Sequence, residues 1–159
     1  MFRRIAIAGL KTGAILSATT LAAIMLAGRR ETGAPWSAVN AICHIVDGDD
    51  VSQPSDFSTR ESVLGAALNS SIMFAWAGLY EAALVMSGKS GGVVPAAAAA
   101  TAAYVIDYKL VPPRFTPGIE KKVSRGSVAA IYAVLGVTLA LSPFWNRYDD
   151  ASSTETSPE

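Results

Sequence analysis

Apolar positions fall into four long stretches along this chain, separated by shorter polar segments. The stretches cover residues 5–28, 63–86, 93–111 and 127–145. A helix that crosses a lipid bilayer needs roughly 20 apolar residues, within a range of about 17–25. The pattern therefore predicts an all-α integral membrane protein in which four transmembrane helices form a single bundle over residues 1–145.

The segment between the first two stretches follows a different pattern. Residues 35–46 carry an apolar stripe and a polar stripe at helical spacing, and Pro35 suits a first helical turn. At ~1.5 Å per residue this segment reaches only about 18 Å, too short to cross. We expect a short amphipathic helix in the membrane interface or against the bundle. Its polar stripe would hold Ser37, Asn40, His44 and Asp47.

Several residues predict where the helices meet, begin and end. Gly9 and Gly13 are four residues apart, which allows another helix to approach the first one closely. Ser58 and Glu61 have the spacing of a capping box at the start of the second helix. Thr116 and Pro117 predict a new helix start after the third stretch.

The third stretch is nearly pure alanine from Pro95 to Ala103, so we expect a thin, central helix. The first stretch runs on to Arg29 and Arg30 without a small-residue cleavage site, which favours a retained helix over a signal peptide. Residues 146–159 are polar, acidic and rich in Ser and Thr, and are predicted to be disordered.

Composition agrees with a membrane protein. Hydrophobic residues make up 51% and charged residues 16% of the chain, against about 25% charged residues in soluble domains. The formal net charge is zero, so no overall field favours nucleic acid as a partner. With a single cysteine, Cys43, and a single histidine, His44, we expect no disulfide within the chain, no metal site and no cofactor. The expected partners are the lipid bilayer and either a second copy or another membrane protein.

The positive charges favour one orientation. With four crossings the two termini share a side, which holds five Lys and Arg residues, whereas the opposite side holds eight. Because positive residues favour the cytoplasmic side, the termini are expected to be periplasmic. The eight residues are Arg29, Arg30, Arg60, Lys109, Arg114, Lys121, Lys122 and Arg125.

Two ionisable residues lie inside the predicted spans near the side of the termini. Lys11 and Glu81 each lie roughly 8–9 Å inside a helix end at ~1.5 Å per residue. Opposite charge at matching depth predicts a buried Lys11–Glu81 ion pair between the first two helices. It would act as a structural tether or handle protons or cations. Alternatively, both side chains extend to the headgroups without pairing.

A polar pocket is predicted at the opposite side. Asn69 and Asp107 lie at similar depth there, and His44 belongs to the short helix beside them. Histidine changes charge near neutral pH, so this trio is the best candidate site. The alternative is that His44 faces water while Asp107 pairs at headgroup level with Lys109, Arg114 or Arg30.

Two weaker patterns involve the same histidine. His44-x4-Asp49 has the spacing of the acid–base pair in glycerolipid acyltransferases. The soluble catalytic domain of those enzymes cannot fit in this chain, so we interpret the spacing as chance and expect no enzyme. His44 with Asp47, Asp49 and Asp50 could bind a divalent cation, but nothing in the sequence defines the geometry.

Several motifs between residues 34 and 140 resemble a group of small bacterial inner-membrane proteins of unknown function. They are Ala34-Pro35-Trp36, His44-x-x-x-Gly48-Asp49, Trp76-x-x-x-Tyr80-Glu81, Asp107 and Arg114-Phe115-Thr116-Pro117-Gly118-x-Glu120. The resemblance implies a location in a bacterial inner membrane and implies no activity.

Two classes of function remain. The first is an accessory or structural membrane component, and the second is a small transporter or proton-linked permeability factor that uses Glu81 and Asp107. A transporter needs a continuous polar path, yet the middle of the third helix offers only Thr101 and the fourth helix only Tyr132 and Thr138. The broken path favours the first class.

Overall fold

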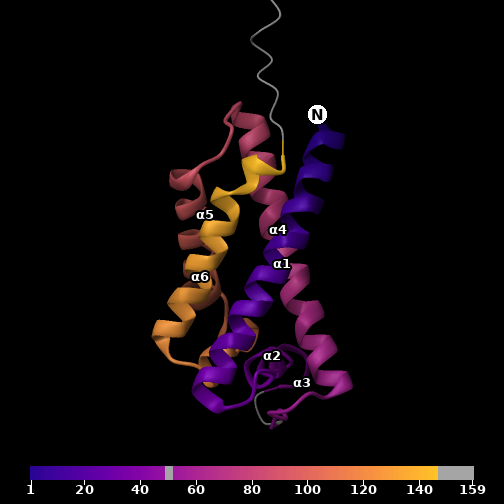
Figure 1. The fold of residues 1–159 in the computed structure, drawn as a ribbon, viewed down its shortest axis with the longest axis vertical. Helices are drawn as coiled ribbons and strands as arrows, with labels where there is room; N and C mark the ends of the chain where they lie inside the picture. The colour runs from indigo at the N-terminus through magenta and orange to yellow at the C-terminus, as the bar shows by residue number, and fades with distance from the viewer. Residues whose placement is uncertain (49–51, 147–159) are drawn as a thin grey trace, which may run out of the picture.

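The computed structural model describes residues 1–48 and 52–146, and its regular secondary structure there is entirely helical. Figure 1 shows the long helices running lengthwise: α1 (Phe2–Thr32), α4 (Thr59–Ser87) and α6 (Arg125–Ala140). Three helical segments in the described residues are long and apolar enough to cross a membrane: Phe2–Thr32, Thr59–Ser87 and Arg125–Phe144. The last includes the 3₁₀ turn η4 (Ser142–Phe144).

Helix α1 packs against both α4 and α6. As the glycine spacing predicts, α1 and α4 approach closely: a Cβ atom on Gly9 would lie 3.3 Å from the Cα atom of Gly78. A Cβ atom on Gly13 would overlap the ring of Phe74. The core between the long helices contains Leu16, Ala77, Leu135 and Leu139.

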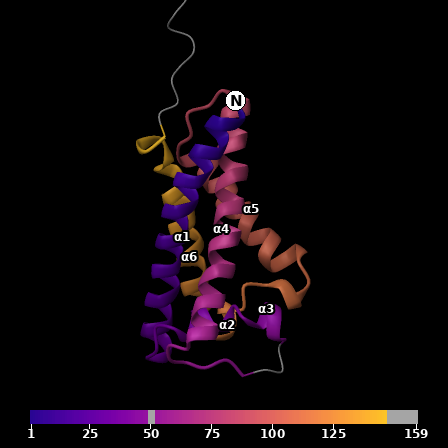
Figure 2. The same cartoon turned by 90° about the vertical axis from the view of Figure 1, so that its right-hand side faces the viewer.

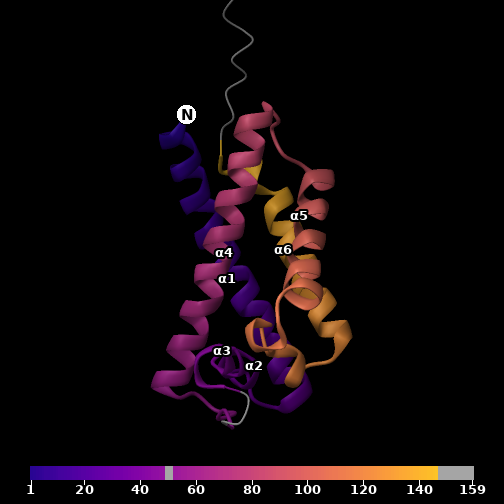
Figure 3. The same cartoon turned by 180° about the vertical axis from the view of Figure 1, so that it is seen from behind.

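The third apolar stretch differs from the prediction. Its α-helix, α5, covers only Val93–Val105, and the π-helical turn η1 (Ile106–Leu110) follows. The prediction that it is central was wrong, because α5 packs mainly on α6 at the edge of the bundle (Figures 1 and 3). Only Ala96 and Ala103 are buried among its residues.

Residues 35–46 do not form one continuous helix. They form α2 (Ser37–Ala41) and the start of α3 (His44–Asp47), with a turn between them. The segment does not lie with a polar face toward water, because Ser37–His44 are all buried. Figure 2 shows α2 and α3 gathered at one end of the long helices. A Cβ atom on Gly65 of α4 would lie 2.2 Å from the Val39 carbonyl oxygen, so the segment packs directly on α4.

The remaining helix ends agree in part with the sequence. Ser58 is the N-cap residue of α4, but the backbone bonds of a capping box do not form: its hydroxyl donates to the Glu61 carboxylate and its amide donates to the Ser62 hydroxyl. Thr116-Pro117 does not start α6: the 3₁₀ turns η2 (Pro113–Phe115) and η3 (Ile119–Lys121) come first. The Ser124 hydroxyl then accepts from the Ser127 amide at 3.3 Å and caps α6. Asn146, predicted to begin a disordered tail, is buried, whereas residues 147–159 lie outside the described part.

Candidate functional site: a polar cavity between the helices

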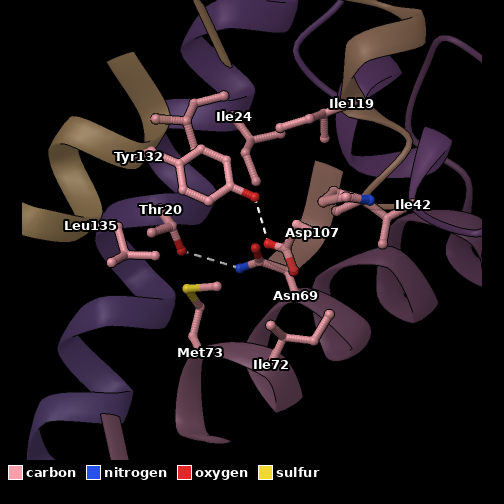
Figure 4. Close-up of a pocket in the computed structure, with 12 residues that line it drawn as sticks. Thr20, Ile24, Ile42, Asn69, Ile72, Met73, Asp107, Ile119, Tyr132 and Leu135 are labelled. Atoms are coloured by element: carbon pink, nitrogen blue, oxygen red, sulfur yellow. Dashed lines mark hydrogen bonds between the residues drawn. The ribbon is translucent and has the colours of Figure 1, made fainter. Parts of the chain in front are cut away.

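A cavity lies between α1, α4, α6 and the segment that follows α5 (Figure 4). Its volume is about 40 Å³, which exceeds the roughly 10–15 Å³ that one water molecule requires. Most of its lining is apolar, and the polar groups come from Thr20, Asn69, Asp107 and Tyr132. The cavity therefore has room for a few water molecules or a small polar group.

Asp107 reaches the cavity from the π-helical turn η1. In this turn the Val111 amide donates to the Ile106 carbonyl at 3.0 Å, five residues back, rather than in the α-helical pattern. Such turns frequently occur at functional sites. The Tyr132 hydroxyl of α6 donates to Asp107 Oδ2 at 2.5 Å (Figure 4). This bond joins the end of α5 to α6 next to the cavity.

Three tyrosine rings pack together beside Asp107. The ring centroid of Tyr104 lies 5.2 Å from that of Tyr108 and 5.4 Å from that of Tyr132. The Tyr108 hydroxyl donates to Glu120 Oε2 at 3.2 Å, and Glu120 Oε1 accepts from the Thr116 hydroxyl at 2.9 Å. The rings therefore hold the π-helical turn against α6 and against the loop that precedes α6.

The opposite wall of the cavity is held by a bond between α1 and α4. Asn69 Nδ2 donates to the Thr20 hydroxyl at 3.3 Å, and that hydroxyl donates to the Leu16 carbonyl at 2.7 Å (Figure 4). Within the described residues, no partner is assigned to the carbonyl oxygen of the Asn69 side chain. An acceptor beside the Asp107 carboxylate suits water or another hydrogen-bond donor.

The structure brings together two of the three predicted pocket residues. Asn69 and Asp107 line the same cavity, whereas His44 does not. The interpretation that Asp107 pairs with Lys109, Arg114 or Arg30 is also wrong, because its hydrogen-bond partner is Tyr132. Asp107 of η1 meets α6 through the hydroxyl of Tyr132, and depth along the sequence alone does not reveal this partner.

His44 lies buried in a separate network on the same side. Lys121 Nζ contacts its Nδ1 atom at 3.3 Å, and its Nε2 atom is 2.8 Å from the Thr116 carbonyl. An ammonium group can only donate, so Nδ1 accepts and Nε2 carries the hydrogen that is donated to the carbonyl. His44 thus ties α3 to the loop between η2 and η3. The alternative in which His44 faces water was wrong.

The predicted Lys11–Glu81 ion pair does not form. Glu81 is buried, and its Oε1 atom accepts from the Thr12 hydroxyl at 2.6 Å and from Asn146 Nδ2 at 3.0 Å. Lys11 is exposed and its Nζ atom lies 3.5 Å from the Trp145 carbonyl oxygen. The predicted depth led to the correct region of α1, but a helix turns about 100° per residue. Thr12 therefore faces Glu81 in place of its neighbour.

Within the described residues, no three His, Cys, Asp or Glu side chains gather around one point. Asp49 and Asp50 lie outside the described part, as does the histidine–aspartate spacing that uses Asp49. Asp47 instead accepts hydrogen bonds from both Arg60 terminal nitrogens, at 2.6 and 3.0 Å. These bonds hold the pKa of the Asp47 carboxyl below its usual value.

Burial raises the pKa of the Cys43 thiol, which disfavours the reactive thiolate.

Sequence reasoning missed Thr20, Tyr104 and Tyr108 as neighbours of the cavity. The four-residue spacing of Tyr104 and Tyr108 places both rings on one helix face, and this was the available signal. Thr20 had no such signal, since a threonine in an apolar helix often bonds its own backbone.

Comparisons with family models, curated proteins and solved structures found no match to this chain.

Proposed function

We propose that this chain is a multi-pass membrane protein that serves as an accessory or structural component of a bacterial inner membrane. The bacterial location follows from the resemblance of its sequence motifs. The membrane itself is supported by the three long apolar helices and by the large apolar side chains on their outer surfaces. Exposure of many large apolar side chains to water is unfavourable. Examples with their exposed fractions are Leu10 63%, Leu79 64%, Met86 73% and Val137 60%.

The direction of the chain supports a fourth crossing. Helix α4 ends, and α6 begins, at opposite ends of the molecule (Figure 1), so residues 88–124 must return along its length. The 13 residues of α5 extend about 20 Å, and η1 carries the chain further. Backbone outside an α-helix is tolerated at membrane depth only against protein or beside water. The cavity and the tyrosine cluster provide such surroundings for η1.

The observation that carries the structural role is that polar groups inside the bundle bond one another between helices. Thr12 bonds Glu81 and Thr20 bonds Asn69, both between α1 and α4. Thr19 and Thr138 bond at 3.0 Å between α1 and α6. Hydrogen bonds of this kind stabilise helix packing in membranes. Between the levels of Glu81 and Asn69 the core is largely apolar, with Leu16, Met73 and Ala77.

Proteoliposomes test this role directly. Purified full-length protein is reconstituted with a pH-sensitive dye inside the vesicles, and a potassium gradient with valinomycin drives proton entry. We expect proton entry no faster than in protein-free vesicles. Entry well above that background would contradict a purely structural role.

A second candidate is a proton-linked permeability factor, and one observation favours it. The Asp107 carboxyl lines a cavity with room for water, and a carboxyl beside water in a membrane bundle can bind and release protons. In the same vesicles, Asp107→Asn would abolish proton entry under this function, whereas Tyr104→Phe, which leaves the carboxyl in place, would retain it. Equal rates for wild type and Asp107→Asn would exclude the second candidate.

A further inference from the structure

A groove lies between α5 and α6, and Tyr132 separates it from the polar cavity by lining both. Its volume is about 650 Å³. The walls are made of small and apolar side chains, and one end carries a cation, Arg125. The wall residues include Ala97, Ala100, Tyr104, Ala129, Ala133 and Val137.

We propose that this groove binds an anionic phospholipid, with its phosphate at Arg125 and an acyl chain along α6. The proposal rests on the membrane location given under the proposed function, because only then does the groove face lipid. A structural membrane component that selects anionic lipid would thereby gain a preferred lipid neighbour at one fixed position.

The charge at the end of the groove favours an anionic headgroup. Arg125 is exposed, and no described residue is assigned to its guanidinium as a hydrogen-bond or ion-pair partner. The carboxylate of Glu31 bonds residues beside Arg125 in the sequence rather than its guanidinium. It accepts from the Ser124 amide at 2.6 Å and from the Ser124 and Ser127 hydroxyls. The Arg125 guanidinium therefore remains available to pair with a phosphate oxygen, which its planar group binds well.

The part of the groove next to Arg125 has the length of a lipid chain in one leaflet, and the groove continues beyond it to Leu141. Arg125 lies at the start of α6, on the side that carries eight Lys and Arg residues in the predicted topology. One leaflet contributes about 15 Å of hydrocarbon, half of a ~30 Å core. At ~1.5 Å per residue, Ala133 lies about 12 Å from Arg125 and Leu141 about 24 Å from it. An acyl chain that starts at Arg125 would contact Ala133 and end before Leu141.

Native mass spectrometry of the full-length protein in detergent tests the proposal, with phosphatidylglycerol and phosphatidylcholine of identical acyl chains as probes. We expect tighter binding of phosphatidylglycerol. Arg125→Gln should weaken it about tenfold, since a hydrogen bond to a charged group typically contributes at least this factor. The matched control is Arg29→Gln, which removes a cation that does not line the groove.

Groove-filling variants test the position of the chain. Ala133→Phe should weaken phosphatidylglycerol binding, and Leu141→Phe, at the C-cap of α6, should leave it unchanged, since both residues are exposed but at different depths. The proposal is overturned if the two lipids bind equally, or if Arg125→Gln has no more effect than Arg29→Gln. It is also overturned if Ala133→Phe and Leu141→Phe act alike, as a helix filling the whole groove would predict. Resistance of the protein to alkaline extraction from membranes checks the membrane location separately.

Discussion

At the scale of single residues, the Asp107 carboxyl depends on one hydroxyl from another helix. Tyr132 is its hydrogen-bond donor at 2.5 Å, and both side chains are partly buried beside the cavity. A polar group that loses its partner in such surroundings keeps the desolvation cost and loses the compensation. The bond thus contributes both to stability and to the position of the carboxyl.

Tyr132→Phe should lower the free energy of unfolding by about 1–3 kcal/mol, because the partly buried Asp107 carboxylate is left without its donor. Unfolding in mixed micelles of mild and denaturing detergent measures this value. Tyr104→Phe is the control: its ring belongs to the same cluster, and no bond of its hydroxyl is assigned in the described residues. Equal effects of the two variants would contradict the role of the Tyr132 hydroxyl.

The contribution of the Glu81 side chain to stability likewise depends on which residue is its hydrogen-bond partner. A double-mutant cycle with Thr12→Val and Glu81→Gln should show a coupling of about 0.6–1.7 kcal/mol, the range for hydrogen bonds between membrane helices. The same cycle with Lys11→Met should be additive, because the Lys11 ammonium contacts the Trp145 carbonyl. Coupling of Glu81 with Lys11 but not with Thr12 would refute the observed arrangement.

At the scale of elements, the short helices on the loop side are held by polar contacts rather than by their own length. Asn40 Nδ2 donates to the Pro54 and Asp56 carbonyls at 2.8 and 2.9 Å, and its oxygen accepts from Ser62 at 2.8 Å. His44 bonds the loop between η2 and η3. The polar stripe predicted to face water therefore joins α2 and α3 to their neighbours, which satisfies its buried groups.

Gly118 allows the loop to approach this segment. Its φ angle is +79°, nearly the same as the +78° of Gly33, so both glycines adopt the left-handed backbone conformation. A Cβ atom at Gly118 would lie 2.4 Å from His44 Cδ2 and 2.7 Å from the Ala41 carbonyl oxygen, whereas at Gly33 it would meet nothing within 4 Å. Gly33→Ala should cost about 1–2 kcal/mol of backbone strain. Gly118→Ala should cost a further 1–3 kcal/mol or so from overlap, measured by the same unfolding assay. Equal losses would show that the contact with His44 is unimportant.

The contact between α3 and α4 should respond to acid. Arg60 lowers the pKa of the Asp47 carboxyl in the folded protein, so this pairing stabilises the fold above the ordinary Asp pKa. Its contribution should fade as the pH falls through the lowered value. Melting temperatures measured from pH 6 downward should therefore fall less steeply for Asp47→Asn than for the wild type. Parallel curves would contradict the contribution.

At the scale of the whole molecule, the polypeptide runs back and forth, and its N-terminus lies at the end opposite α2 and α3 (Figure 1). Asn146 lies against Thr12 and Glu81 in the half of the molecule nearer that end. Four crossings in a membrane would keep the α4–α5 turn on the side of the termini. The loop before α4 would lie on the other side. Both segments have exposed residues that suit chemical labelling, Lys89 and Ser55.

Lys89→Cys and Ser55→Cys should react with a membrane-impermeant maleimide from opposite sides of a sealed vesicle. A Cys43→Ser background removes the native thiol, and the serine hydroxyl can replace its bond to the Glu61 carbonyl. If the positive side is cytoplasmic, Ser55→Cys reacts only from that side. Reaction of both positions from one side would exclude four crossings.

The sequence alone determined much of the helix content and the presence of helices long and apolar enough to cross a membrane, because bilayer-length apolar stretches and N-cap residues such as Ser58 are local signals. It also placed Asn69 and Asp107 at one level, since depth follows from residue count along a helix. Only the tertiary structure decided the partners: Thr12 in place of Lys11 at Glu81, Tyr132 in place of His44 at Asp107. Partners depend on how each helix is rotated about its axis and on where a π-helical turn redirects the chain. Packing of all the helices sets both, and residue spacing within one segment does not report them.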